Sequence, residues 1–200
     1  MPKKPTKQEL ADATSKTIRD VIAYDLDVLF CGINPGLYSA AIGHHFGRPG
    51  NRFWPALHLG GFTARQYDPS EDGNLLELGY GITNVVARTS ARADELAREE
   101  LTKGAVLLEK KVLKYKPRFL AVLGIVAYRQ AFSKPMAQMG EQEAIGSSRV
   151  WVLPNPSGLN AHVQIADLKK IFSEFRQIVY SISKDSNSKH SNSKDPESID

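Results

Sequence analysis

The sequence contains a single cysteine, Cys31, among its 200 residues. One cysteine excludes an intrachain disulfide, and it also excludes an iron–sulfur cluster or a cysteine zinc site held within one chain. No apolar run approaches the roughly 20 residues that a membrane span needs, and the first residues do not resemble a signal peptide. A phosphate loop with its lysine and a complete dinucleotide fingerprint are also missing. We therefore expect no membrane contact, and we rank the common nucleotide-binding classes low.

The charge of the chain is mildly basic, with a formal net charge of +4 and a pI of about 9.1. Residues 181–200 hold three lysines and four acidic residues, so the first 180 residues carry +5 (4 + 1). A basic folded core is compatible with a polyanionic partner such as nucleic acid. An ordinary solvated surface gives the same charge.

Both ends of the chain are polar, and the apolar patterns lie between them. Residues 181–200, SISKDSNSKHSNSKDPESID, cannot bury enough apolar surface to offset their ordering entropy, which predicts a disordered tail. Residues 1–22 predict a polar N-terminal extension with a short helix over about 7–21. The hydrophobic content of 42% suffices for one core, which we place in a single domain over 23–180.

Short β-rich runs alternate with helical patterns inside this domain. The predicted strands are 26–32, 80–86, 118–124 and 149–154, and the predicted helices are 54–61, 107–115, 126–132 and 165–182. Such alternation indicates an α/β fold with three layers, α/β/α, around a mainly parallel central sheet. Ligands of these sheets bind beyond the carboxyl ends of the strands.

Two similar loops follow the first and the last predicted strands, GINPG at 32–36 and PNPSGLN at 154–160. Asn34 and Asn155 each precede a proline, which keeps them out of helical geometry, and a glycine close behind lets a ligand approach. Either motif alone is explained by an ordinary turn. If both strands are parallel, however, both loops emerge at the same edge of the sheet, and we expect the two asparagines to face one site.

Three stretches in this order, FCGINPGL (30–37), GHHF…PGNRFW (43–54) and VLPNPSGL (152–159), resemble the mismatch-specific uracil/thymine DNA glycosylases, the group that contains bacterial Mug and thymine DNA glycosylase. The resemblance covers residues 24–180. It implies a uracil-DNA glycosylase-like α/β fold and the excision of a flipped base from duplex DNA.

The resemblance places Asn34 at the catalytic position, where its amide holds a water near the sugar carbon. An amide is a poor proton acceptor, and without a general base worth about 10²–10⁴-fold we expect a slow enzyme. Backbone N–H groups near Ile33 and after Gly36 are expected to stabilise the departing anion. Asp94 supplies the missing carboxylate if its loop folds over the pocket; an N-cap or a solvated acid is the alternative.

The same resemblance assigns a pocket for the flipped base. Phe46 matches the aromatic residue on which the base stacks, which is worth roughly 1–3 kcal/mol. His45 resembles the histidine of the thymine-accepting branch and is expected to donate to a pyrimidine oxygen. Ser39 lies where the family varies a small residue near the 5-position, and Asn84 lies where it places a polar residue. Core packing for Phe46 and a structural role for His45 remain alternatives.

The last motif matches the family's wedge loop. Leu159 fills the hole that the flipped base leaves, and Gly158 and Asn160 flank it so that their backbone groups pair with the orphaned guanine. Asn160 departs from the residues expected after the wedge. Ser157, two residues after Asn155, is expected to bond a phosphate. The alternative is a strand-to-helix turn with an exposed leucine.

Together these expectations describe a monofunctional glycosylase that removes uracil, and thymine or damaged pyrimidines, opposite guanine and leaves an abasic site for base excision repair. No lysine lies in the motifs, so no Schiff base is expected, and neither a cofactor nor a metal. We expect a monomer on double-stranded DNA with G·U or G·T mismatches, cytoplasmic and nucleoid-associated in a bacterium or nuclear in a eukaryote. The rivals are a non-catalytic module that binds mismatches or abasic sites, and a nucleotide-binding α/β enzyme.

Overall fold

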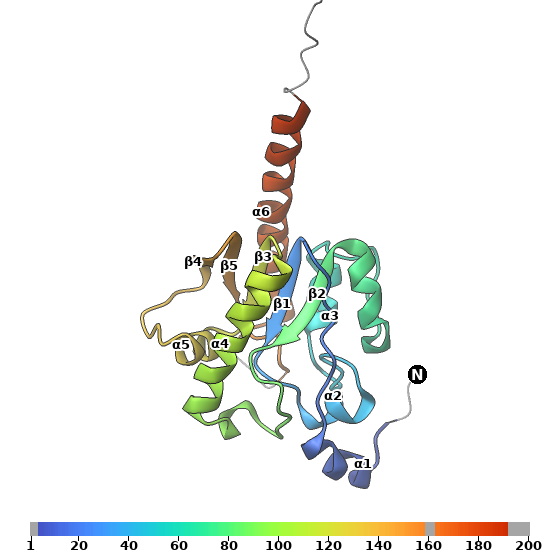
Figure 1. Cartoon of the computed structure of the whole chain (residues 1–200). Helices are drawn as coiled ribbons and strands as arrows, with labels where there is room; N and C mark the ends of the chain where they lie inside the picture. The colour runs from blue at the N-terminus through green and yellow to red at the C-terminus, as the bar shows by residue number, and fades with distance from the viewer. Residues whose placement is uncertain (1–3, 159–162, 192–200) are drawn as a thin grey trace, which may run out of the picture.

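The computed structural model describes residues 4–158 and 163–191 and contains one five-stranded sheet in the order β2-β1-β3-β5-β4 (Figure 1). The strands are β1 Val28–Gly32, β2 Tyr80–Asn84, β3 Phe119–Leu123, β4 Gly140–Ile145 and β5 Ser148–Leu153. The first four in sheet order run parallel, whereas β4 pairs antiparallel with β5 at one edge. The predicted α/β fold with a mainly parallel sheet is confirmed. The pattern missed β4, because GEQEAI is a polar, largely exposed edge strand.

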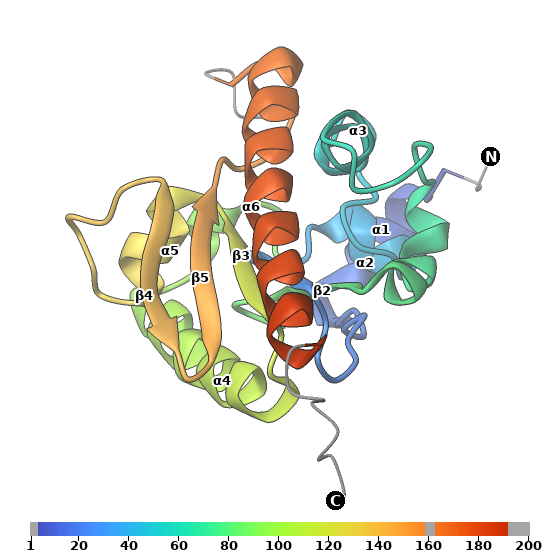
Figure 2. The same ribbon diagram turned by 90° about the horizontal axis from the view of Figure 1, so that it is seen from above.

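Helices cover both faces of this sheet. The α-helices are α1 Lys7–Asp12, α2 Leu37–Ile42, α3 Phe53–Leu59, α4 Arg98–Tyr115, α5 Ile125–Ala131 and α6 Ile165–Ser191, and the 3₁₀ segments are η1 Ala13–Ser15, η2 Pro69–Leu78 and η3 Ala93–Glu95. Figure 2 shows α4 and α5 on one face of the sheet and α3 and α6 on the other. None of the described helices combines the length and the apolar character needed to cross a membrane.

The alternation of side chains along β1 explains the layers. Val28 and Phe30 belong to the core cluster under α3 and α6, whereas Leu29 and Cys31 belong to the cluster under α4 and α5. Successive strand residues point to opposite faces, so a run that is buried throughout needs helices on both sides. Burial raises the pKa of the Cys31 thiol, which keeps it protonated and unreactive.

The structure differs from the predicted helix bounds at both ends of the chain. The helix predicted over 7–21 is too long, because α1 ends at Asp12 and η1 at Ser15. The segment that follows pairs with β2 through its backbone. Val21 and Ile82 exchange two hydrogen bonds, of 2.9 and 2.8 Å.

At the other end, α6 continues to Ser191, so residues 181–191 of the predicted disordered tail are helical in the structure. No glycine or proline interrupts the chain between Ile165 and Pro196. Residues 192–200 lie outside the described part of the chain.

Candidate active site

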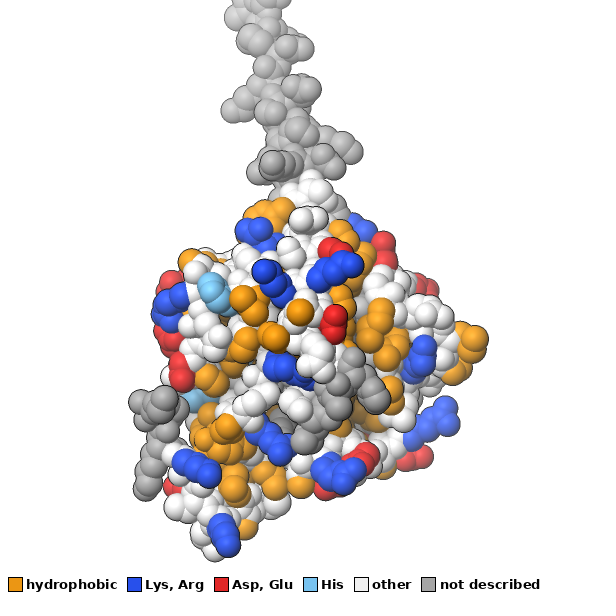
Figure 3. Space-filling view, turned by 180° about the vertical axis from the view of Figure 1, so that it is seen from behind, with side chains coloured by type: hydrophobic (Ala, Val, Ile, Leu, Met, Phe, Trp, Pro, Cys, Tyr) orange, Lys and Arg blue, Asp and Glu red, His pale blue; other side chains and the backbone are white. Residues whose placement is uncertain are grey.

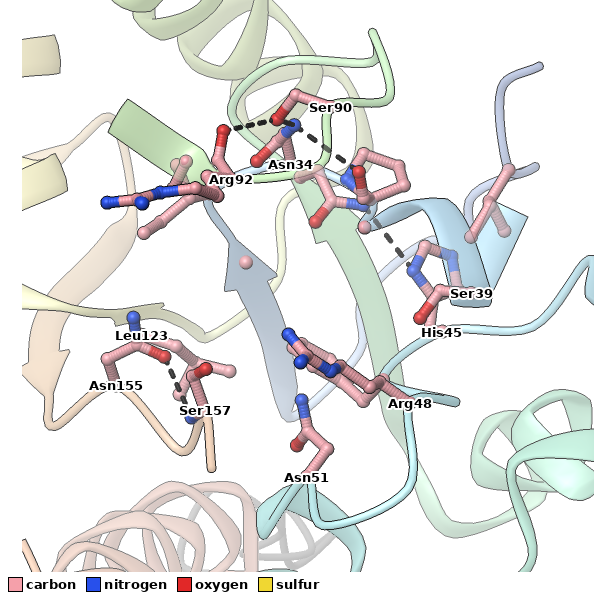
Figure 4. Close-up of a pocket in the computed structure, with 18 of the residues that line it drawn as sticks. Asn34, Ser39, His45, Arg48, Asn51, Ser90, Arg92, Leu123, Asn155 and Ser157 are labelled. Carbon is pink, nitrogen blue, oxygen red and sulfur yellow. Dashed lines mark hydrogen bonds between the residues drawn. The ribbon is translucent and has the colours of Figure 1, made fainter. Parts of the chain in front are cut away.

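A cavity of about 820 Å³ lies at the carboxyl ends of the parallel strands (Figure 4). The loops after β1, β2 and β5 all contribute to its walls, so the GINPG and PNPSG loops meet there. The predicted site residues that line it are Ile33, Asn34, Gly36, Ser39, His45, Phe46, Asn84, Asp94, Asn155 and Ser157. Leu159 and Asn160 lie outside the described residues.

The Asn34 carboxamide is oriented by three hydrogen bonds. Its Nδ2 lies 3.0 Å from the carbonyl oxygen of Arg88, 3.3 Å from that of Pro35 and 2.7 Å from Ser90 Oγ. Carbonyl oxygens only accept, and the Ser90 hydroxyl donates its own proton to the Arg92 carbonyl at 2.7 Å. All three neighbours of this end of the amide are therefore acceptors, which fixes the nitrogen there.

The oxygen end of the same amide is left for the cavity. No residue within 4–158 or 163–191 donates a hydrogen bond to Asn34 Oδ1. Figure 4 shows the nitrogen turned toward Ser90. Asn34 therefore presents a neutral acceptor to the cavity, which can hold a water by one of its protons.

A second amide, that of Asn84, is oriented by His45. His45 is 2% exposed, and its ring Nε2 lies 3.0 Å from the carbonyl oxygen of Arg19, so Nε2 carries the proton. Burial lowers the pKa of His45, which favours the neutral ring. Nδ1 is then an acceptor and receives the Asn84 Nδ2 donor at 3.4 Å. The only N–H of the neutral ring is already given to Arg19, so the predicted donation from His45 to a pyrimidine oxygen is not available in this arrangement.

With its nitrogen on His45, Asn84 places its oxygen beside Gly32, which also lines the cavity. A Cβ atom built on Gly32 would lie 2.5 Å from Asn84 Oδ1 and 3.3 Å from Phe46 Cζ. Gly32, at the end of β1, therefore leaves room for a carboxamide oxygen beside an aromatic ring. The Asn84 oxygen and the edge of the Phe46 ring therefore lie close to the same point above Gly32.

Phe46 itself adopts a conformation that is unusual for a residue with a side chain. Its φ is +52°, in the left-handed region, and one face of its ring stacks on Phe53 with the centroids 4.0 Å apart. Because Phe46 also lines the cavity, the remaining face is the one available for stacking. Backbone strain of this kind persists only where the surroundings enforce it.

Hydrogen bonds from three other parts of the chain enforce it. The backbone N–H of His45 donates to the Asp72 carboxylate at 3.2 Å, and Trp54 Nε1 donates to the His45 carbonyl at 3.3 Å. On the other side of Phe46, the N–H of Gly47 donates to the buried Ser39 hydroxyl at 3.0 Å. The ring of Phe46 is thus held from both neighbouring residues.

Asp94 lies at the rim of the cavity in η3, and its carboxylate is already engaged. Arg92 donates to it through Nε at 3.0 Å and Nη2 at 2.6 Å. Arg92, not Asp94, takes the position before η3, so the N-cap alternative for Asp94 does not apply. The Asp94 side chain is 63% exposed, and exposed ion pairs are worth only about 0–1 kcal/mol, so this pair opens at little cost.

The loop after β5 is braced by Arg52. The N–H of Arg52 donates to the Pro156 carbonyl at 3.0 Å, and Nη2 donates to the Ser157 carbonyl at 2.6 Å. Nη1 donates to the carbonyl of Val163. Asn155 closes the turn by accepting the N–H of Ser157 at 2.9 Å. Arg52 therefore holds the two sides of this loop together.

Gly158 packs against the neighbouring loop. A Cβ atom at this position would lie under 3.0 Å from the carbonyl oxygen of Gly50, so only glycine allows this approach. The contact joins the loop of the second motif to that of the third.

Several contributors to the site were not predicted from the sequence, and Ser90, Arg88 and Ile18 are examples. Ser90 and the Arg88 carbonyl hold Asn34, and the topology offered a way to find them, because the loop after β2 must lie beside the loop after β1. Ile18 lines the cavity although it was assigned to the N-terminal extension, and no sequence pattern pointed to it.

The site offers neutral amides, an aromatic face and an exposed ion pair. Among the described residues, no group of three or more His, Cys, Asp and Glu side chains is placed to hold a metal ion.

Comparison with known proteins places this site in a family. Residues 19–178 match the model of the uracil DNA glycosylase superfamily. The chain belongs to this superfamily. A solution NMR structure from Methanosarcina acetivorans, which bears a provisional uracil DNA glycosylase name, has a TM-score of 0.54 and 17% identity, covering 80% of this chain and 98% of its own. At that identity the likeness concerns the fold. Membership of this superfamily supports an activity of the DNA glycosylase type, which is a hydrolase activity. The match is to the superfamily as a whole and does not select one of its branches.

Proposed function

We propose that this superfamily member is a monofunctional, mismatch-specific DNA glycosylase. It hydrolyses the N-glycosidic bond of uracil, and of thymine or damaged pyrimidines, opposite guanine in duplex DNA. The observation that carries the proposal is the Asn34 carboxamide, whose nitrogen is held by three acceptors while its oxygen is left for the cavity.

The proposed reaction uses Asn34 to place a water. The glycosidic bond breaks first, and the base leaves as an anion while the sugar gains oxocarbenium character. The water that Asn34 Oδ1 holds then bonds to the sugar carbon, and its proton goes to solvent or to the departing base. Because an amide does not remove the proton, the gain comes from positioning, and we expect a slow enzyme.

Base selection is assigned to Asn84 and Phe46. Uracil and thymine carry an N–H at ring position 3, which suits an acceptor such as Asn84 Oδ1, whereas cytosine presents a lone pair there. Stacking on the free face of Phe46 is worth roughly 1–3 kcal/mol, which offsets much of the cost of unstacking the base. Uracil or thymine opposite guanine is only wobble-paired, so its extrusion costs less, which supports mismatch preference.

Asp94 has a secondary part in this proposal. Its carboxylate reaches the water only when its exposed pair with Arg92 opens. Approach of a DNA phosphate would compete for that guanidinium and favour the opening.

The DNA is proposed to lie over the loop after β5, where Ser157 contacts a phosphate and Gly158 leads into the predicted wedge. Figure 3 shows Lys and Arg side chains spread over the face seen from behind Figure 1, with Asp and Glu side chains among them and at its edges. The proposed phosphate contacts predict binding that weakens as salt rises.

The deciding experiment is strand cleavage by alkali after incubation with labelled duplexes that contain G·U, G·T or A·U, and with single-stranded uracil DNA. We expect cleavage at G·U and a loss of about 100-fold in Asn34→Ala, because misplaced reactants cost about that much. Asn74→Ala, an exposed asparagine on η2, is the matched control and should cleave like the wild type. Tight mismatch binding without cleavage of any substrate would instead favour a binding module.

A further inference from the structure

The segment 16–21, which we call the strap, follows η1 and is pinned at both ends. At one end, the carbonyl of Lys16 accepts a hydrogen bond from Thr89 Oγ1 at 2.6 Å. At the other end, Val21 and Ile82 exchange their backbone hydrogen bonds. The strap therefore joins the loop after β2 to β2 itself.

The middle of the strap is also held. The carbonyl of Arg19 accepts the Nε2–H of His45 at 3.0 Å, and the carboxylate of Asp20 accepts the Thr83 hydroxyl at 2.8 Å. Lys111 from α4 pairs with the same carboxylate. The first two contacts reach His45, which lines the cavity, and Thr83, which directly precedes Asn84.

Ile18 lies between the anchors at Lys16 and Arg19, is half-buried and lines the cavity. Hydrogen bonds hold the backbone on both sides of Ile18, so this residue keeps its place in the cavity wall. The superfamily match begins at residue 19, so Ile18 stands just outside it.

We infer that Ile18 is a specificity-determining residue, which limits the space for substituents on the flipped base. This inference rests on the proposed function, because it takes the cavity as the base pocket. Ile18 adds an apolar side chain to a cavity wall that also includes Ile33 and Leu123. One methylene in an apolar pocket changes discrimination by about 10–200-fold, so the size of this wall should decide which 5-substituted uracils are accepted.

The test compares substrates within one variant. Single-turnover excision is measured with the full chain on duplexes containing G·U, G·T and 5-bromouracil opposite guanine. For Ile18→Ala we expect the rates for thymine and 5-bromouracil, relative to uracil, to rise roughly tenfold. For Ile18→Phe we expect these ratios to fall. A loss of folded protein lowers all rates together and leaves the ratios unchanged.

Ile22→Ala is the matched control, because Ile22 follows the strap but packs against the core under α4 and α5. It should keep the wild-type ratios. Ratios that stay within about twofold of wild type in both Ile18 variants would overturn the inference while leaving the glycosylase intact. Absence of excision by the wild-type chain would overturn both.

A second pair of variants tests the strap itself. Thr89→Val has nearly the same shape but cannot donate to the Lys16 carbonyl, and we expect it to shift the ratios in the same direction as Ile18→Ala, by less. Thr89→Ser keeps the hydroxyl and should restore the wild-type ratios. Wild-type ratios in Thr89→Val would show that this anchor does not hold Ile18.

Discussion

The side-chain nitrogen of Asn34 lies 2.7 Å from the hydroxyl oxygen of Ser90, and that hydroxyl donates onward to the carbonyl of Arg92. The two side chains come from the loops after β1 and β2, which are neighbouring parallel strands. The orientation of the amide in the proposed catalytic position is therefore set by a loop about 55 residues further along the chain.

Replacing Ser90 should test how much this contact contributes. Ser90→Ala removes one of three acceptors around Asn34 Nδ2. A net hydrogen bond is worth about 0.5–1.5 kcal/mol, so we expect the single-turnover excision rate to fall about 2–10-fold with unchanged DNA affinity. Ser90→Thr keeps a hydroxyl and should recover most of the rate. A loss as large as that of Asn34→Ala would mean that Ser90 has a more direct part in the reaction.

The contribution of Asp94 to the excision rate can be measured with two variants. Asp94→Asn replaces the carboxylate by an amide, and Arg92→Ala removes the partner of the carboxylate. Because the carboxylate is held by Arg92, we expect Asp94→Asn to lower the excision rate less than tenfold, below the 10²–10⁴-fold of a general base. Arg92→Ala frees the carboxylate and should raise the contribution of Asp94. A fall of 100-fold or more in Asp94→Asn, with a flattened pH profile, would identify Asp94 as the base.

Acid should destabilise the fold through His45. Burial places the pKa of the folded His45 below its ordinary value of about 6.5, so the unfolded chain binds more protons near pH 6 than the folded one. Stability is therefore lost as pH falls from about 6.5 toward the lower folded pKa. Protonated Nδ1 also ceases to accept from Asn84. We expect urea unfolding of wild type, but less so of His45→Gln, to become easier between pH 7.5 and 5.5.

Two exposed ion pairs titrate at lower pH than His45. They therefore do not affect the comparison of wild type with His45→Gln between pH 7.5 and 5.5. Arg65 lowers the pKa of Glu71 to about 2, and Arg88 does the same for Glu100. Their stabilisation is present above the ordinary pKa of glutamate and is lost only as pH falls toward 2, in both proteins. Parallel stability curves for wild type and His45→Gln would contradict the assignment to His45.

A buried glycine in α4 offers a stability test of the packing beside the site. A Cβ atom on Gly104 would clash with the carbonyl of Val85, which directly follows β2. Alanine gains about 1 kcal/mol of helix propensity over glycine, but overpacking costs about 1–3 kcal/mol, so we expect a net loss of stability in Gly104→Ala. Gly73→Ala, which meets nothing within 4 Å, should be neutral or stabilising. Urea unfolding of both variants decides the sign.

The strands were predictable because their residues are buried on both faces. The run from Val28 to Cys31 is apolar throughout, and in a chain where strands alternate with helices such a run is typical of a strand covered on both faces. The edge strand β4 was not predictable in this way, since its exposed residues carry no apolar pattern. The end of α1 was missed because the residues after it bond to β2, and a local helical pattern does not report a partner 60 residues away.

The site was predictable where a motif marked it and not where the fold alone assembles it. Asn34 and Phe46 stand in motifs, and the structure brings them to one cavity. Ile18 stands in no motif. The tautomer that the neighbours of His45 favour depends on the Arg19 carbonyl, which only the folded chain brings to the ring.

The hydrogen bonds that hold Asn34 also bear on which amino-acid substitutions this chain can tolerate during evolution. Two of its three acceptors, at Pro35 and Arg88, are main-chain carbonyls, which every amino acid supplies. Substitution at position 88 therefore leaves the acceptor in place as long as the loop keeps its course. Drift can alter the side chains around this amide far more freely than it can alter the path of the backbone beneath them.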